Sequence, residues 1–393
     1  FELLTYLASD AVMPAMPVVV GDLNASPEYI PHALNLYLLG GVVLQWLIGP
    51  LADRYGRRPL LLVGCAFFGL ACLATFWVHD IGLFNLLRLL QGIGLGFVVT
   101  VSYPALNEAF SEADAVRMMA LLANIALLSP LLGPLVGTLL LQWLDWRWLF
   151  VAFAIGAVLV WGLLYRLMPE TLGVERRDGS RLAYTPIHLL PLLAGYGQLL
   201  ANRRFVAGSA ALGLVGLPLI GWIGLSPVLL IHDEGLSTMA YALWQLPVFG
   251  GLILGNLIIN RIAGRHPPPA LVRGALWPYL AGLCLMVLAT WYWPSVTSVV
   301  AGMSLYALGL GVANAVLYRM TLFSSEQSKG LVSAMLGMIT IALLGLGGAL
   351  LAMIGAGASL LHFALAAGLA GALALWPLWF VVGGRPGQGA VAD

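Results

Sequence analysis

Three ionisable side chains stand in segments that are otherwise apolar enough to lie in a membrane. Glu2 and Asp10 lie in FELLTYLASDAVMPAMPVVV, and Arg88 lies in LLRLLQGIGLGF. A charge at the centre of a bilayer costs about 3 kcal/mol on insertion scales, so such residues face the interior of a helix bundle and mark ion or substrate pathways. Two carboxyl groups and an arginine can hold a proton, exchange it for a cation, or pair with each other. These residues therefore predict a proton-carrying site.

The rise of a helix places Asp10 and Arg88 at comparable depths. At 1.5 Å per residue, Asp10 lies about 15 Å and Arg88 about 10 Å below the outer ends of their segments, which is close enough for an ion pair. Glu2 lies about 12 Å deeper than Asp10 and roughly 80° around the helix. We expect the arginine to hold one acid ionised, whereas burial away from water leaves the other poised to take up a proton.

Both Glu2 and Arg88 have a structural alternative. The chain starts at Phe1, already inside an apolar run, and we expect the first helix to begin upstream of this sequence. Glu2 would then suit an interfacial position near a truncated terminus. The alternative for Arg88 is a purely structural ion pair.

The composition of the whole chain requires a membrane environment. Of its 393 residues, 61% are hydrophobic and 9% are charged, and the net charge is +1. Soluble domains carry about 25% charged residues, so these charges cannot cover a soluble surface. The near-neutral balance gives no indication of a nucleic-acid partner. The cysteines lie in apolar runs without metal-ligand spacing and are interpreted as small buried hydrophobes: Cys65, Cys72 and Cys284.

Apolar runs of spanning length recur along the chain, and about 20 residues cross a bilayer core. We predict an all-α membrane protein with twelve transmembrane helices, because an open sheet cannot satisfy its backbone in lipid. The predicted spans are 1–20, 31–51, 59–78, 81–110, 116–142, 146–168, 204–231, 239–264, 271–293, 295–323, 329–355 and 358–382. They form an N-terminal bundle of six helices (1–168, its first helix truncated), a cytoplasmic linker (169–203), a C-terminal bundle of six (204–382) and a cytoplasmic tail (383–393).

Basic residues orient these helices. With the first helix running outward, all but two of the 18 Lys and Arg residues fall on the inner side. The exceptions are Arg88, which lies within a span, and Arg147, which lies in an outer loop. Basic loops stay in the cytoplasm, so we expect both termini to be cytoplasmic.

The short loop GPLADRYGRRP joins the second and third spans and carries Asp53, Arg54 and Arg57. By composition alone it would be a positive-inside anchor. The order Gly-x-x-x-Asp-Arg-x-Gly-Arg-Arg resembles the signature of the major facilitator superfamily, whose fold is two pseudo-symmetric six-helix bundles. In that family the loop latches the two halves together in one conformation, so the resemblance implies a conformational latch at these residues. A weaker repeat of this loop sequence, NLIINRIAGRHPPP, follows the eighth span, at the matching place in the second half.

A second pattern, NIALLSPLLGPLVGT, lies in the fifth span and contains Pro130, Gly133, Pro134 and Gly137. Each proline removes a helix hydrogen bond and can kink the helix. Glycines four residues apart share a face and permit close helix approach. The order Gly-Pro-x-x-Gly resembles the antiporter motif of the superfamily's drug exporters, and the alternative is an ordinary packing seam.

A narrower resemblance covers essentially all twelve predicted spans. It rests on FELLTYLASDAVMPAM, QWLIGPLADRYGRRP, LLRLLQGI, LLSPLLGPLVG, LWQLPVFGGLILGN and LYALGLGVANAVLYRMTLFSSEQSKG, which resemble MdfA-type multidrug/proton antiporters. The resemblance implies that Glu2 and Asp10 take part in recognising cationic drugs and in proton exchange, and that Arg88 serves proton transfer. Glu108 matches a family acid, although an interfacial carboxylate is the simpler interpretation. Ser9 departs from the family, whose members often have Asn there.

These observations predict a secondary active multidrug efflux transporter that exchanges protons for lipophilic cationic or neutral drugs. We expect it to lie in the bacterial inner membrane, to work as a monomer and to use the proton gradient. The sequence has no Walker-type motif and no catalytic or metal-ligand set, so neither a cofactor nor an enzyme is expected.

Further polar and aromatic residues could line a substrate cavity, although each also suits helix packing. They are Tyr6, Asn124, Trp222, Gln245, Phe249 and Asn256. The small number of such polar side chains favours a drug cavity. The first alternative, a proton-coupled carrier of one specific metabolite, would need several polar side chains that converge on its substrate. The second alternative is a non-transporting receptor or scaffold, which would have no reason to keep embedded charges.

Overall fold

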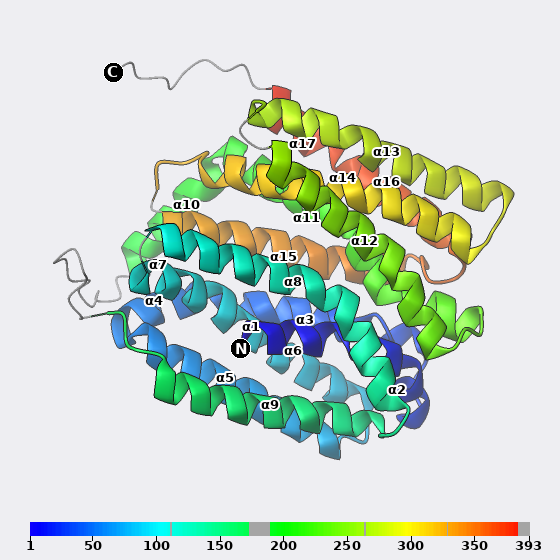
Figure 1. Ribbon diagram of the computed structural model, residues 1–393, viewed down its shortest axis with the longest axis horizontal. Helices are drawn as coiled ribbons and strands as arrows, with labels where there is room; N and C mark the ends of the chain where they lie inside the picture. The colour runs from blue at the N-terminus through cyan, green and yellow to red at the C-terminus, as the bar shows by residue number, and fades with distance from the viewer. Residues whose placement is uncertain (111, 173–188, 263–264, 328, 384–393) are drawn as a thin grey trace.

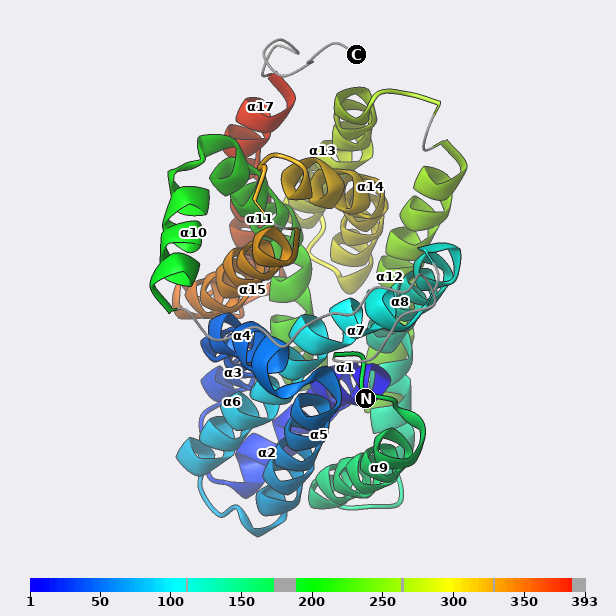
Figure 2. The same cartoon turned by 90° about the vertical axis from the view of Figure 1, so that its left-hand side faces the viewer.

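A computed structural model describes residues 1–110, 112–172, 189–262, 265–327 and 329–383. Every regular element in these ranges is a helix, and the helices run roughly parallel or antiparallel to one another (Figure 1). Two groups lie side by side, with α1–α9 in one and α11–α17 in the other (Figure 2). This arrangement confirms the all-α class and the division into two helical halves.

The first half contains nine α-helices in its described residues. They are α1 (Glu2–Asp10), α2 (Met16–Asp22), α3 (His32–Val43), α4 (Gln45–Tyr55), α5 (Arg57–Ala74), α6 (Ile81–Phe97), α7 (Tyr103–Ala109), α8 (Glu112–Leu141) and α9 (Trp146–Leu167). Short 3-10 turns η1 (Met13–Ala15), η2 (Pro27–Tyr29) and η3 (Thr75–Trp77) and a π-helical segment η4 (Val98–Ser102) join some of them.

The second half begins after the short helix α10 (Leu189–Ala201), which packs against α11 and α15. Its helices are α11 (Arg203–Ser226), α12 (Thr238–Ile262), α13 (Pro268–Tyr292), α14 (Val296–Leu322), α15 (Lys329–Met353), α16 (Leu360–Leu373) and α17 (Leu375–Gly383). A π-helical segment η5 (Pro227–Asp233) extends α11. The helix α10 lies within the predicted linker 169–203, and residues 173–188 of that linker lie outside the described ranges.

The described residues contain ten or eleven of the twelve predicted membrane-spanning helices. Ten are long and apolar enough to cross a membrane, and eleven if the bent pair α3–α4 counts as one span. The predicted fifth span falls in α8, a helix of 30 residues whose described part Leu128–Leu141 is apolar. Twelve helices are consistent with this count.

Large apolar side chains cover the outside of the two groups. Val158, Trp277 and Trp376 are 70%, 80% and 75% exposed. So many exposed apolar side chains would be unfavourable in water, whereas they suit contact with lipid. The interior is packed by buried aromatic and aliphatic side chains, and the first span is among the most buried. The halves meet along two helix pairs, α3 with α15 and α8 with α12.

The predicted span 1–20 agrees with a single candidate span over Glu2–Asp22, but its helix is irregular in the middle. Ordinary helix ends at Asp10, a 3-10 turn follows over Met13–Ala15, and α2 begins at Met16. Pro14 and Pro17 lack the N–H that a continuous helix would require. The break leaves the last carbonyls of α1 without partners further along the helix, and it places Asp10 at that end.

Candidate functional site

Asp10 lies where the end of α1 meets α8. Its side chain is 5% exposed, and the hydroxyl of Ser129 donates to its Oδ2 at 3.0 Å. A Cβ on Gly133 would lie 2.6 Å from the Asp10 Cβ, and one on Gly137 would lie 2.0 Å from the Ala11 carbonyl oxygen. The two glycines therefore let α8 approach the break in the first span.

The four motif residues of α8 thus have a defined neighbour. Pro130 and Pro134 both lie inside this helix, and the glycines share the face that contacts α1. The sequence predicted close helix approach at this motif without identifying the partner helix. The structure brings the motif and the carboxyl of Asp10 together.

Arg88 is completely buried, as predicted for a charge inside a span. Its Nε donates to the Ala33 carbonyl at 3.2 Å, and its Nη1 donates to the Ala8 carbonyl at 3.2 Å and to Gln91 Oε1 at 2.7 Å. The guanidinium carbon lies 4.6 Å from the centre of the Tyr37 ring. Arg88 therefore connects α6 to both α1 and α3.

The expected ion pair between Arg88 and Asp10 is not formed between these two described residues. Ala8 belongs to the last turn of α1, where free carbonyls and the helix dipole carry negative partial charge. This end of the helix, together with the Tyr37 ring, takes the place of a carboxylate. The predicted match in depth holds, because the accepting carbonyl is two residues from Asp10.

Glu2 and Tyr6 extend the site along α1. The residues Glu2, Tyr6 and Asp10 are four apart, so they follow one face of the helix. Tyr6 lies one turn from each of the two acids. Glu2 is only 5% exposed. The interior position favours a role in the bundle over the interfacial alternative for Glu2.

The second half contributes a hydrogen-bonded cluster of polar side chains. Trp222 Nε1 donates to Gln245 Oε1 at 2.7 Å, and Gln245 Nε2 donates to Ser226 Oγ at 3.2 Å. Phe249 is buried one turn further along α12. Tyr241, one turn before Gln245, is also buried.

Tyr241 was missed from the sequence, although its spacing could have identified it. The residues Tyr241, Gln245 and Phe249 follow one face of α12 at four-residue intervals. Two further candidates were Asn256 and Asn124. Asn256 donates to the Leu252 carbonyl of its own helix, and the side chain of Asn124 lies outside the described residues.

The predicted latch residues form an ionic network at the other end of the first half. Arg57 contacts Asp53 at 2.6 Å and Glu108 at 3.0 Å, and the Thr171 hydroxyl donates to Glu108 at 2.6 Å. Glu108 is partly buried and paired with Arg57, a position that suits an interfacial carboxylate as well as a family acid. Arg54 is exposed and lies over the Tyr55 ring. The described partners of this network all belong to the first half.

Glu170 completes this network and was not identified from the sequence. Its carboxylate accepts from the backbone N–H groups of Arg57 at 2.9 Å and Arg58 at 3.2 Å, which caps the start of α5. Gly56 has φ +105, and a Cβ there would collide with the Glu170 carboxylate. The glycine of the motif is therefore needed for this cap.

Comparisons with known proteins agree with this architecture. The model of the Major Facilitator Superfamily matches residues 2–328. The chain is 45% identical to the multidrug transporter MdfA of Yersinia pestis (strain D106004) over 88% of this chain and 83% of that protein. It is 44% identical to the protein of the same name from Edwardsiella ictaluri (strain 93-146), with the same coverage.

Solved structures of low sequence identity share the fold. A D-xylose–proton symporter superposes with a TM-score of 0.76 at 16% identity, covering 97% of this chain and 95% of that one. The human organic anion transporter MFSD10 superposes with a TM-score of 0.66 at 18% identity, covering 97% and 96%. At such identities the likeness concerns the fold alone.

Proposed function

Because this chain belongs to the major facilitator superfamily, we propose that it is a secondary active exporter that exchanges protons for lipophilic cationic or neutral drugs. The relatives that it matches are named multidrug transporters. The observation that carries the proposal is the position of Asp10. This carboxyl is buried at the end of α1, against the glycine face of α8, and α8 in turn packs on α12 of the second half.

A change of charge at Asp10 affects its hydrogen bond with Ser129, its attraction for a cation and its contact with α8. The ionised carboxyl accepts the Ser129 hydrogen bond at 3.0 Å and attracts a cation, whereas the protonated form loses that attraction. The close contact with Gly133 ties this change to α8, and α8 packs on α12 of the second half. Protonation can therefore alter both drug binding and the contact between halves.

Exchange requires that a proton and a drug compete for the same acids. A ligand that weakens another is weakened by it to the same extent, because linkage is reciprocal. Glu2 and Asp10 supply the carboxyls, and Tyr6 lies between them. Neutral drugs would compete by displacing water around the acids rather than by charge.

Arg88 positions the end of α1 in this scheme. It binds carbonyls of α1 and α3 from α6, so the helix end that carries Asp10 is fixed by a permanent positive charge. That charge also favours the ionised form of Asp10, which is the form that a cationic drug would bind.

The drug site would lie between the acids of α1 and the aromatic face of α12. Trp222, Gln245 and Phe249 are buried in the second half. Their helix α12 packs against α8, whose Gly133 lies against Asp10. Apolar and aromatic walls with few polar groups suit lipophilic compounds of varied shape. The latch at Asp53, Arg54 and Arg57 would steady the basic end of the molecule in one conformation.

We further propose that the protein works as a monomer in the bacterial inner membrane, with both termini cytoplasmic. The distribution of basic residues supports this orientation. The energy source would be the proton gradient, with no bound cofactor.

Proton release on drug binding tests the proposal directly. Purified protein in weakly buffered detergent near neutral pH should release protons when a lipophilic cation is added, and Asp10→Asn should abolish the release. Glu2→Gln should reduce resistance to cations more than to neutral drugs in an efflux-deficient bacterium, because only the cation loses a charge partner. Wild-type protein that releases no protons, together with full resistance in both variants, would contradict the proposal.

A further inference from the structure

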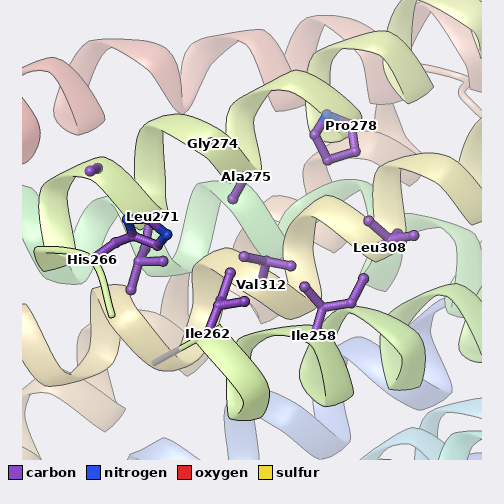
Figure 3. A pocket seen from close by; sticks show the side chains of 10 residues that line it. Ile258, Ile262, His266, Leu271, Gly274, Ala275, Pro278, Leu308 and Val312 are labelled. Carbon is purple, nitrogen blue, oxygen red and sulfur yellow. The ribbon is translucent and has the colours of Figure 1, made fainter. Parts of the chain in front are cut away.

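A groove of about 420 Å³ lies between α12 and α13, with α14 beneath it (Figure 3). Its walls are apolar along most of its length and include Ile258 of α12, Leu271 of α13 and Val312 of α14. The nearby side chains of Leu257 and Trp277 are 53% and 80% exposed. In a membrane-spanning helix such side chains contact lipid, so the groove opens toward the bilayer and not toward Asp10.

One end of the groove is basic. His266 lines it (Figure 3). Arg261 lies in the last turn of α12, Arg265 in the segment that follows, and Arg273 near the start of α13, and all three are exposed. Arg319, near the end of α14, lines a smaller pocket of about 200 Å³ beside the start of α13. This end belongs to the side of the molecule that carries most of the arginines.

The surrounding sequence supplies no acid to balance these charges. No Asp or Glu occurs between Glu234 and Glu326. The four arginines form no ion pair within the part of the chain that the structure describes. Four cations gathered at one end of an apolar groove therefore have no counter-charge from the described part of the protein.

The first half treats the matching loop differently. There Asp53 and Glu108 both contact Arg57. The second-half sequence NRIAGRHP repeats DRYGRRP with one extra residue, and Asn260 stands where the first half has Asp53. The acid has been replaced by a neutral amide, while Arg265 keeps the position of Arg57.

We propose that this groove binds an anionic phospholipid, with its phosphate at Arg261, Arg265 and His266 and an acyl chain along the apolar walls. The planar guanidinium group suits bidentate contact with phosphate. Anionic lipids are attracted to basic residues at the cytoplasmic surface. The lipid supplies the negative charge that Asp53 and Glu108 supply in the first half.

Selection in this site comes from the headgroup rather than from the chain. Lipid tails are as apolar as the groove, so no hydrophobic driving force favours the groove over bulk lipid. Its shape fixes where the chain lies, and the arginines decide which headgroup stays. A zwitterionic lipid can fill the same groove but leaves the positive charge uncompensated.

Native mass spectrometry of the purified full-length chain tests the headgroup preference. The protein is released from micelles that contain equal amounts of phosphatidylglycerol and phosphatidylethanolamine. We expect phosphatidylglycerol to be retained preferentially by the wild type. The double variant Arg261→Gln, Arg265→Gln should lose this preference by on the order of twentyfold, at about fivefold for each charge.

A matched control removes two exposed arginines elsewhere at the basic end. The variant Arg203→Gln, Arg204→Gln changes the start of α11 by the same charge and should keep the wild-type preference. Equal retention of the two lipids by the wild type, or an equal loss in both double variants, would overturn the proposal.

Filling the groove provides an independent test. Gly274 lines the groove, and a side chain there would meet nothing within 4 Å. Gly274→Leu should therefore fold normally and release phosphatidylglycerol, whereas Gly250→Leu, at another open glycine, should retain it. Full retention of the lipid by Gly274→Leu, or a wild type that retains a second copy of the chain in place of lipid, would contradict the assignment.

Discussion

Arg88 shows how a membrane-embedded cation is stabilised without a facing carboxylate. Its donors reach the carbonyls of Ala8 and Ala33 and the side chain of Gln91, and its flat face covers Tyr37. Backbone carbonyls at a helix end are permanent acceptors that no pH change can neutralise. The arginine can therefore hold α1 in place whether Asp10 is protonated or ionised.

We expect Arg88→Lys to reduce export of a lipophilic cation by roughly tenfold or more. A lysine keeps the charge but cannot direct donors to two helices at once, and each charged hydrogen bond contributes about 1.5–3 kcal/mol. Dye efflux from cells normalised for protein in the membrane measures the effect. Arg166→Lys is the control, because this arginine is exposed in the last turn of α9 and the change keeps its charge. Full efflux by Arg88→Lys would refute the positioning role.

The sequence correctly predicted that Arg88 is buried. It predicted the wrong partner, Asp10, and the reason is physical. Charged residues are visible in a sequence, whereas carbonyl groups that lose their helix partners are not. The Ala8 carbonyl is available to Arg88 because α1 ends at Asp10, and this depends on how the chain folds beyond that residue. The same limit explains Tyr241, whose burial beside Gln245 depends on how α12 packs.

Among the helices, the contact between α1 and α8 depends on glycine. The spacing of Gly133 and Gly137 predicted that some helix would approach closely, and the structure identifies α1. The twelve-helix pattern was readable because apolar length is a local property. The breaks in the first span and the π segments η4 and η5 were not predicted, because they depend on contacts between helices.

We expect Gly137→Ala to impair both stability and export. The added Cβ would lie 2.0 Å from the Ala11 carbonyl oxygen, so α1 and α8 must separate, at a cost of about 1–3 kcal/mol. Thermal unfolding in detergent and dye efflux measure the two effects. Gly162→Ala on α9 is the matched control, since a Cβ there meets nothing within 4 Å. Equal thermal stability and equal efflux in the two variants would show that the contact between α1 and α8 tolerates separation.

For the whole molecule, the arrangement of the halves decides which side of the membrane the site can face. In this structure α2 contacts η5, and the start of α3 lies close to the end of α11. These contacts close the end remote from the basic loops. Export requires this end to open, because a drug taken up from the cytoplasmic side must leave on the other side.

A disulfide across that end should therefore stop transport. A Cβ on Gly224 of α11 would lie 3.5 Å from the Cβ of Pro31, at the start of α3, within the separation that disulfides require. The double variant Pro31→Cys, Gly224→Cys should lose export under oxidising conditions and regain it with a reductant that crosses the membrane. Each single variant should export under both conditions, which excludes effects of the native cysteines. If the oxidised double variant is fully cross-linked and still exports drug, the two halves do not separate at this end during transport.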